Sequence, residues 1–167
     1  MSRNIPTRTA LSEPVHVRTL TAPTPGEIQA LSDIFDQYRV HYGEGSDVLQ
    51  SATWLEQNVS TGRLLAFVAE AGARFVGFAI TMEVPASLRL AQFWGIRDLF
   101  VLPKHRRVGV GRALLASIRA AAIASGALRV VLQTEEDNDP ALRLYIDSGY
   151  TLIKGYCSLM LPIVPEP

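Results

Sequence analysis

The chain is poor in the groups that crosslink small proteins or attract charged partners. It has one cysteine, Cys157, so no disulfide can form within the chain, a usage typical of a reducing compartment. Its 16 basic and 16 acidic side chains cancel, so any positive field has to be local. Its three histidines show no metal-ligand spacing, and we predict no metal site. We also expect no nucleic-acid partner and no membrane partner.

Long apolar runs are missing too. No run approaches membrane-spanning length, and residues 1–14 lack the apolar core of a signal peptide, so we expect a cytoplasmic protein. A length of 167 residues with 48% apolar content suffices for one domain with a sizeable core. We predict a flexible arm over residues 1–14, a single domain over residues 15–163 and a tail over residues 164–167.

Hydrophobic periodicity predicts strands and helices in the order β-α-α-β-β-β-α-β-α-β-β. The predicted strands are residues 15–20, 64–70, 74–84, 90–101 and 128–134, with one or two more within 150–163. The predicted helices are residues 27–40, a second helix around 54–59 capped by Ser51 or Thr53, residues 112–125, and a last helix from Asn138 or Asp139 to Gly149. This order predicts a mixed sheet with helices on its faces, an α/β or α+β fold.

The most informative motif is a basic, glycine-rich stretch, residues 106–112, between a predicted strand and a predicted helix. The first amides of a helix have no intrahelical partner, and glycines let the backbone approach a phosphate. We therefore predict a pyrophosphate-bearing ligand here, although Gly109 and Gly111 also suit a plain strand-to-helix turn. No Lys-Ser or Lys-Thr follows, which excludes a Walker loop, and Leu114 stands where a dinucleotide fingerprint has a small residue.

This stretch resembles the signature Gln/Arg-x-x-Gly-x-Gly/Ala of the GNAT superfamily, the acyl-CoA-dependent N-acetyltransferases. Upstream, Asp98-Leu99-Phe100-Val101 with Pro103 is similar to the strand before that loop, and downstream Asn138-x-x-Ala141-x-x-Leu144-Tyr145-x-x-x-Gly149-Tyr150 is similar to the second signature. The resemblance covers residues 64–163 and implies a GNAT-like, mostly antiparallel central sheet flanked by helices. The Asp-Leu-Phe-Val strand and Tyr38-Arg39-x-His41-Tyr42-Gly43 also resemble the histone- and polyamine-type branch.

The resemblance implies acetyl-CoA as the acetyl donor and a bulge in the strand before the loop, with one backbone amide near Phe100 facing the thioester oxygen. The residues implied in binding coenzyme A are Leu99, Phe100, Val101, Arg106, Arg107, Val108, Gly109, Val110, Gly111, Arg112, Asn138 and Tyr145. For Asn138, a plain helix cap is an equally simple explanation.

Acetyl transfer to an amine requires a base for the amine and an acid for the leaving thiolate. The resemblance implies Tyr145 as the acid, although an inward tyrosine on a helix can also serve packing alone. The polyamine-type branch often has a glutamate where this chain has Arg97. The base is therefore left to Asp98, Glu135, His41 or ordered water, and Asp98 is our candidate; a salt-bridge role for it stays open.

We expect the acceptor to be a primary amine of a small molecule, such as an amino acid or an antibiotic-like amine, that attacks directly in a ternary complex. The residues expected to contact it are Tyr38, His41, Tyr42, Trp94, Glu135 and Tyr156. The alternatives are a non-catalytic acyl-CoA sensor and a protein or peptide N-acetyltransferase. A homodimer is expected only by analogy with such families.

Overall fold

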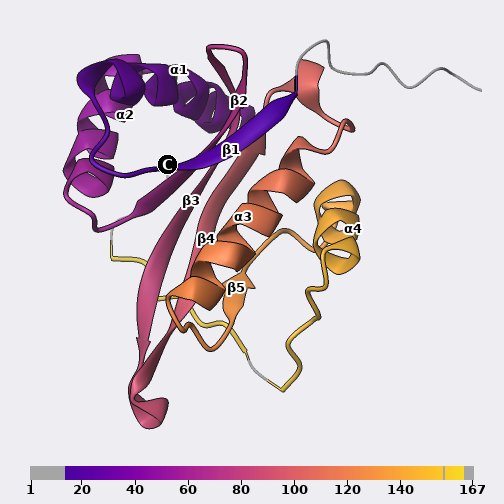
Figure 1. Ribbon diagram of the computed structural model, residues 1–167. Helices are drawn as coiled ribbons and strands as arrows, with labels where there is room; N and C mark the ends of the chain where they lie inside the picture. Colours follow the sequence, from indigo (N-terminus) through magenta and orange to yellow (C-terminus); the bar gives the residue numbers. More distant parts are fainter. Residues whose placement is uncertain (1–13, 156, 164–167) are drawn as a thin grey trace, which may run out of the picture.

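A computed structural model describes residues 14–155 and 157–163, which form a five-stranded sheet with helices on both faces (Figure 1). The predicted tail, Tyr156 and all but the last residue of the predicted arm lie outside the described residues. The strands, in their order across the sheet, are β1 (Val15–Leu20), β2 (Leu65–Ala71), β3 (Arg74–Ala86), β4 (Ala91–Val101) and β5 (Val130–Leu132). The helices are α1 (Pro25–His41), α2 (Val48–Leu55), α3 (Val110–Ala124) and α4 (Asp139–Asp147).

Neighbouring strands from β1 to β4 are antiparallel, and β5 is parallel to β4. A π-helical turn (Glu56–Ser60) follows α2, and short 3-10 turns follow β3 and β4. The predicted mixed, mostly antiparallel sheet with flanking helices is confirmed.

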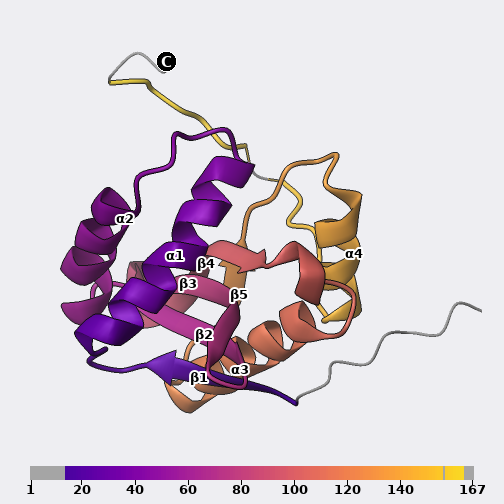
Figure 2. The same cartoon turned by 90° about the horizontal axis from the view of Figure 1, so that it is seen from above.

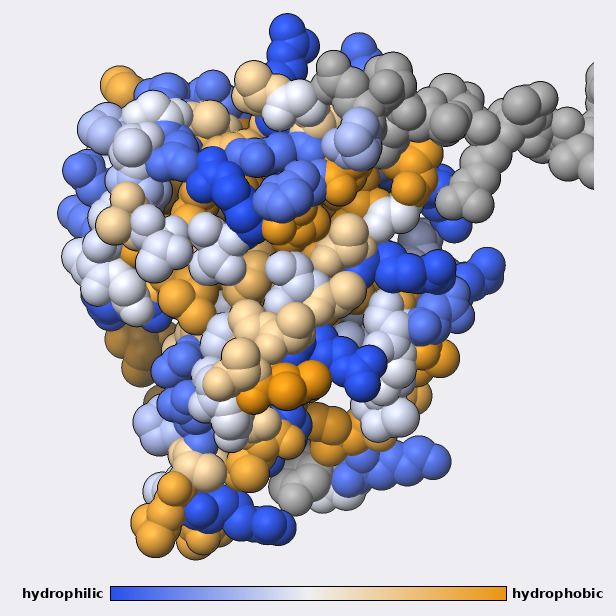
Figure 3. Space-filling view, viewed as in Figure 1, coloured by the Kyte–Doolittle hydropathy of each residue, from blue (hydrophilic) through white to orange (hydrophobic). Residues whose placement is uncertain are grey.

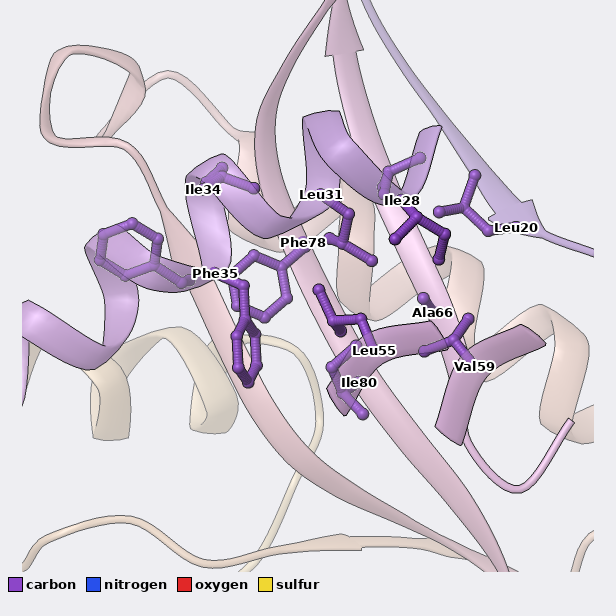
Figure 4. Close-up of a cluster of buried hydrophobic side chains, with 12 residues drawn as sticks. Leu20, Ile28, Leu31, Ile34, Phe35, Leu55, Val59, Ala66, Phe78 and Ile80 are labelled. Carbon is purple, nitrogen blue, oxygen red and sulfur yellow. The ribbon is translucent and has the colours of Figure 1, made fainter. Parts of the chain in front are cut away.

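Helices α1 and α2 cover one face of the sheet, opposite α3 (Figure 2). Thr24 caps α1: its hydroxyl accepts from the Glu27 N–H at 3.3 Å, and its own N–H donates to the Glu27 carboxylate at 2.8 Å. The apolar side of α1 then packs on Phe78 and Ile80 of β3 (Figure 4). Removing this apolar surface from water fixes α1 on the sheet, and with it the C-terminal turn that carries two of the predicted site residues.

Helix α3 covers the other face, and two glycines determine how closely it packs. A Cβ atom on Gly77 of β3 would lie 3.1 Å from Cγ1 of Val110, the first residue of α3. A Cβ atom on Gly111 would lie 3.0 Å from Cδ2 of Leu144 on α4. The start of α3 is therefore pressed against both the sheet and α4, which places the glycine-rich turn beside the end of β4.

The end of the chain differs from the prediction. Residues 150–155 and 157–163 form no strand, so the final one or two strands expected there are wrong for the described residues. Gly155 has a φ of +84°, which interrupts an extended run, and Pro162 has no N–H to donate to a ladder. Strand β5 is also shorter than expected, because its pairing with β4 ends at Leu132.

Strands β3 and β4 project beyond the sheet as a hairpin whose tip is apolar (Figures 1 and 3). Leu88 and Leu90, at this tip, are almost fully exposed. The hairpin tip and the glycine-rich turn lie at opposite ends of β4. None of the helices in the described ranges is both long and apolar enough to cross a membrane.

Asp36 of α1 is buried and holds the loop that leads into α2. Its carboxylate accepts from the Ser46 hydroxyl at 2.6 Å and from the Asp47 N–H at 2.8 Å. Asp47, rather than the expected Ser51 or Thr53, caps α2 by accepting from the Gln50 N–H at 2.8 Å. Asp36 therefore couples the two helices on this face.

We expect Asp36→Asn to lower the free energy of unfolding by about 2 kcal/mol, because the buried network loses the charge and one of the two acceptor oxygens of Asp36. The hydrogen bond from Ser46, above all, lowers the pKa of the Asp36 carboxyl. Its stabilisation is therefore complete above the unfolded carboxyl's pKa of about 3.9 and is lost as the pH falls through the lower folded pKa. Urea titration at several pH values measures this, with Asp33→Asn, an exposed aspartate on the same helix, as the control.

Candidate active site

A β-bulge in β4 organises the site. Ile80 of β3 pairs with Asp98, whereas the next residue, Thr81, pairs with Ile96. Arg97 is therefore an extra residue on β4, and the alternation of side chains between the two faces is reset there. The bulge that the family resemblance implied is present.

Because of the extra residue, the even-numbered side chains of β4 lie on one face of the sheet before the bulge and on the opposite face after it. Phe100 lies in the cluster under α1, and Asp98 accepts a hydrogen bond from Tyr38 of α1. Trp94 is buried against α3 at 3% exposure, with its ring 6.2 Å from that of Phe67. The structure therefore does not bring Trp94 together with the other residues expected to contact the acceptor, since the sheet separates it from Asp98.

On the side facing β5, the second half of β4 has no strand partner, because β5 pairs with only three residues of β4. The Leu102 N–H donates to the carbonyl of Val76 on β3 at 3.0 Å, so by antiparallel alternation the backbone groups of Phe100 also point to β3. The backbone groups of Leu99 and Val101 point the other way, into the gap beside β5. The amide of Phe100, the residue near which an amide was expected to face the thioester oxygen, therefore points to β3 and not to this open edge.

The turn from β4 to α3 presents a run of unused N–H groups. Arg107 and Gly109 have positive φ angles of +64° and +101°, and Gly109 caps α3 without a side-chain hydrogen bond. The first backbone bond into α3 joins the Ala113 N–H to the Gly109 carbonyl at 3.0 Å. In the described part of the chain, the N–H groups of residues 107–112 have no acceptor. A concave row of such groups is suited to an anion.

Two of the three arginines at this turn contact other elements. Arg106 Nε donates to the Val101 carbonyl at 2.8 Å, and its guanidinium carbon lies 5.4 Å from the Phe100 ring centroid. Arg112 lies 3.6 Å from the Asp147 carboxylate of α4, in an exposed pair. Arg106 therefore reaches toward the α1 side of β4, whereas Arg112 lies on the α4 side.

Asp98 is half-buried, and the Tyr38 hydroxyl donates to its Oδ1 at 2.8 Å. Burial raises the pKa of the Asp98 carboxyl, while the Tyr38 hydrogen bond and the charge of Arg97 oppose that rise. Burial and the Asp98 charge raise the pKa of the Tyr38 phenol. Tyr38 therefore stays a donor, and Asp98 is a more basic carboxylate than one in water.

Tyr145 of α4 is half-buried against the hydrophobic cluster under α3. Burial, with smaller contributions from Tyr42, Tyr150 and Glu135, raises the pKa of Tyr145 to about 12. Its ring meets that of Tyr150 edge-on, 5.9 Å between centroids. Such a phenol is fully protonated at neutral pH and can act only as a proton donor.

Asn138 and Glu135 form the loop that leads into α4. Asn138 Oδ1 accepts from the Ala141 N–H at 3.3 Å, so Asn138 is the helix cap. Asn138 Nδ2 also donates to Glu135 Oε2 at 3.3 Å. The Glu135 backbone and Asn138 lower the pKa of the exposed Glu135 carboxyl, which makes it a weaker base than Asp98.

The remaining acceptor residues lie at the exposed C-terminal end of α1. His41 and Tyr42 are exposed, and the rings of Tyr42 and Tyr38 lie 5.0 Å apart. The His41 ring lies 5.9 Å from that of Phe100, so this end of α1 adjoins the α1 side of β4. Sequence reasoning assigned no role to Tyr150, whose only signal is that it is the last residue of the second signature.

Comparison with known proteins identifies the class. The profile described as "Acetyltransferase (GNAT) family" matches residues 28–150. An uncharacterized N-acetyltransferase, YhfO, of Bacillus subtilis is 30% identical over 134 residues, which is 80% of this chain and 90% of that protein. The chain therefore belongs to the GNAT family of acetyltransferases.

Solved structures share its fold. The crystal structure of a probable acetyltransferase superposes with a TM-score of 0.83 at 26% identity, over 90% of this chain and 99% of that one. An aminoglycoside acetyltransferase from an uncultured soil metagenomic sample superposes with a TM-score of 0.77 at 15% identity, over 89% and 96% of the two chains. These relatives do not single out the histone- and polyamine-type branch.

Proposed function

We propose that this acetyltransferase moves an acetyl group from acetyl-CoA to a primary amine of a small molecule. The observation that carries the proposal is the unpaired edge of β4 beside β5, which leads to the unused backbone N–H groups of the glycine-rich turn. Asp98 on the α1 side of β4 and Tyr145 on α4 are the proton-transfer groups proposed to act there. A raised carboxylate pKa at Asp98 and a protonated phenol at Tyr145 are the complementary pair that amine acetylation needs.

Residues of the glycine-rich turn and of the β4 edge are suited to hold the donor. The N–H groups of residues 107–112 match a pyrophosphate, and Arg107 and Arg112 add charge. The backbone groups of Leu99 and the N–H of Val101, whose carbonyl already accepts from Arg106, match the amides of a pantetheine arm, in the manner of an added strand. Acetyl-CoA, when bound, supplies the activated acetyl thioester.

Asp98 and Tyr145 divide the proton transfers. Asp98, directly or through water, accepts the proton of the acceptor ammonium, so that the free amine can attack. Tyr145 donates a proton toward the departing sulfur. The free amide of Leu99 or Val101 is placed to stabilise negative charge on a carbonyl oxygen in the gap.

The acceptor is proposed to enter from the α1 side. Tyr42 and His41 are exposed there. The charges of Glu135 and Asp98, which favour a cationic amine, act on Tyr42 together with the opposing charge of Arg106. A screen of amino acids, simple amines, aminoglycosides and peptides, with released thiol as the readout, tests this; turnover of peptides alone would contradict it.

The donor site is tested by a matched pair of glycine substitutions. Gly109 and Gly126 lie at opposite ends of α3, both have positive φ, and a Cβ atom on either would meet nothing within 4 Å beyond its chain neighbours. We expect Gly109→Ala to weaken acetyl-CoA binding at least about tenfold, because the N–H groups of the turn are re-aimed, about 1.4 kcal/mol. Gly126→Ala carries the same kind of backbone strain and should bind like the parent.

Isothermal titration calorimetry with acetyl-CoA measures both affinities. A Gly109→Ala protein that binds as tightly as Gly126→Ala would place the pyrophosphate elsewhere. Binding without turnover of any amine would instead support the acyl-CoA sensor.

A further inference from the structure

We propose that Tyr38 is a positioning residue that fixes the Asp98 carboxylate for the acceptor amine, rather than a residue that binds the acceptor. The inference rests on the proposed function, in which Asp98 takes the proton. The Tyr38 hydroxyl already donates to Asp98 Oδ1 at 2.8 Å, so its one proton is committed within the protein.

The Tyr38 ring is held by neighbours on several sides. It meets Phe78 edge-on at 5.7 Å between centroids and lies 5.8 Å from both Phe35 and Phe100. Tyr42 closes a further side at 5.0 Å. A ring packed in this way has little freedom, so the position of its hydroxyl is set by the hydrophobic core under α1.

The two oxygens of Asp98 have different surroundings. Oδ1 accepts from Tyr38, whereas Oδ2 has no hydrogen-bond partner among the described residues and is not one of their buried unpaired polar atoms. Oδ2 is therefore not fully buried, and it lies on the α1 side of the bulge with Asp98. One oxygen is anchored and the other is available, which is how a fixed carboxylate presents a single proton acceptor.

The hydrogen bond also sets how readily Asp98 ionises, because a donor to a carboxylate favours its charged form. The other ionisable groups around this pair are Arg97 on β4, His41 and Tyr42 on α1, Arg106 in the turn and Glu135 before α4. None of these donates a hydrogen bond to Asp98 in the described structure. Tyr38 is thus the direct partner through which the protein holds this carboxylate.

The test is Tyr38→Phe, which keeps the ring and removes only the hydroxyl. We expect the pKa of Asp98 to rise by about one unit, and the acid limb of kcat/KM to move to higher pH by the same amount. At a pH below the Asp98 pKa of both the parent and the variant, kcat/KM should be about tenfold lower in the variant, and the difference should disappear at high pH. Tyr150→Phe is the control, since it removes a half-buried phenol hydroxyl that has no contact with Asp98.

The pKa is followed by NMR of ¹³Cγ-labelled aspartate, with Asp98→Asn identifying the resonance, so this reading does not depend on turnover. An unshifted Asp98 resonance in Tyr38→Phe overturns the inference. A shifted resonance with an unmoved acid limb, or an equal loss of rate at every pH, also overturns it. Failure of the parent to acetylate any amine overturns the proposed function instead, and calorimetry and near-UV circular dichroism confirm that the variant binds acetyl-CoA and is folded.

Discussion

Replacing Asp98 by asparagine is expected to lower kcat/KM about 100-fold, the range of effect found when a general base is removed. Asparagine has the same shape but accepts no proton at neutral pH. It can still accept a hydrogen bond from Tyr38, so the fold under α1 should persist. The Kd for acetyl-CoA should stay close to that of the parent, because Asp98 lies on the α1 side of β4, away from the glycine-rich turn.

Glu135→Gln is the comparison that makes this result specific. Both carboxylates lie near Tyr42, but the pKa of Asp98 is raised by burial, whereas hydrogen bonds lower that of Glu135. The better base at neutral pH is therefore Asp98, and Glu135→Gln should keep kcat, measured at a saturating acceptor concentration, within about threefold of the parent. A large loss in Glu135→Gln with little loss in Asp98→Asn would exchange the two roles.

The pH profile gives an independent check. A base must be ionised to act, so kcat/KM should rise as the pH climbs through the raised pKa of Asp98, above the ordinary aspartate value of about 3.9. The acceptor amine also loses a proton, at its own pKa. Acceptors of different basicity separate the two, because the limb due to Asp98 stays in place while the limb due to the amine moves.

Local motifs predicted the parts of the site that one segment of chain determines. The glycine-rich turn before α3 and the Asn138 cap of α4 both lie where the sequence placed them. Each depends on a few adjacent residues: a glycine that adopts positive φ, or a side chain that caps the next turn. Whether the turn binds a pyrophosphate remains a prediction.

Features that depend on two strands could not be predicted from this sequence. Simple alternation along β4 would put Trp94 and Asp98 on one face. The extra residue, Arg97, has meaning only relative to the register of β3, in which Ile80 and Thr81 pair on either side of it. The bulge thus explains why Asp98 faces α1 whereas Trp94 faces α3. It became an expectation only through the family resemblance.

The contact between Tyr38 and Asp98 shows the same limit. Sequence spacing could place Tyr38 on an inward face of α1, but not its hydroxyl on Asp98, which lies 60 residues further along the chain. A long-range hydrogen bond of this kind is decided by how α1 packs on β3 and β4. The distinction between a residue that contacts a ligand and one that supports its neighbour is therefore made by tertiary structure.

Replacing Tyr145 by phenylalanine is expected to lower kcat at least about tenfold, or about 1.4 kcal/mol at the barrier, with little change in the Kd for acetyl-CoA. The hydroxyl is the only group removed, and it is proposed to protonate the leaving sulfur. The ring remains to pack against Tyr150. Steady-state kinetics at saturating acetyl-CoA, together with calorimetry, separates a loss at the barrier from a loss of binding.

Tyr150→Phe is the matched control, because the two rings form one edge-on pair and burial raises the pKa of both phenols. It should retain the parental kcat. Since the pKa of Tyr145 is raised to about 12, the phenol stays protonated well above neutral pH, and kcat should not fall between about pH 8 and pH 10 on its account. Equal kcat values for Tyr145→Phe and the parent would remove this hydroxyl from the reaction, and the sulfur would then take its proton from water.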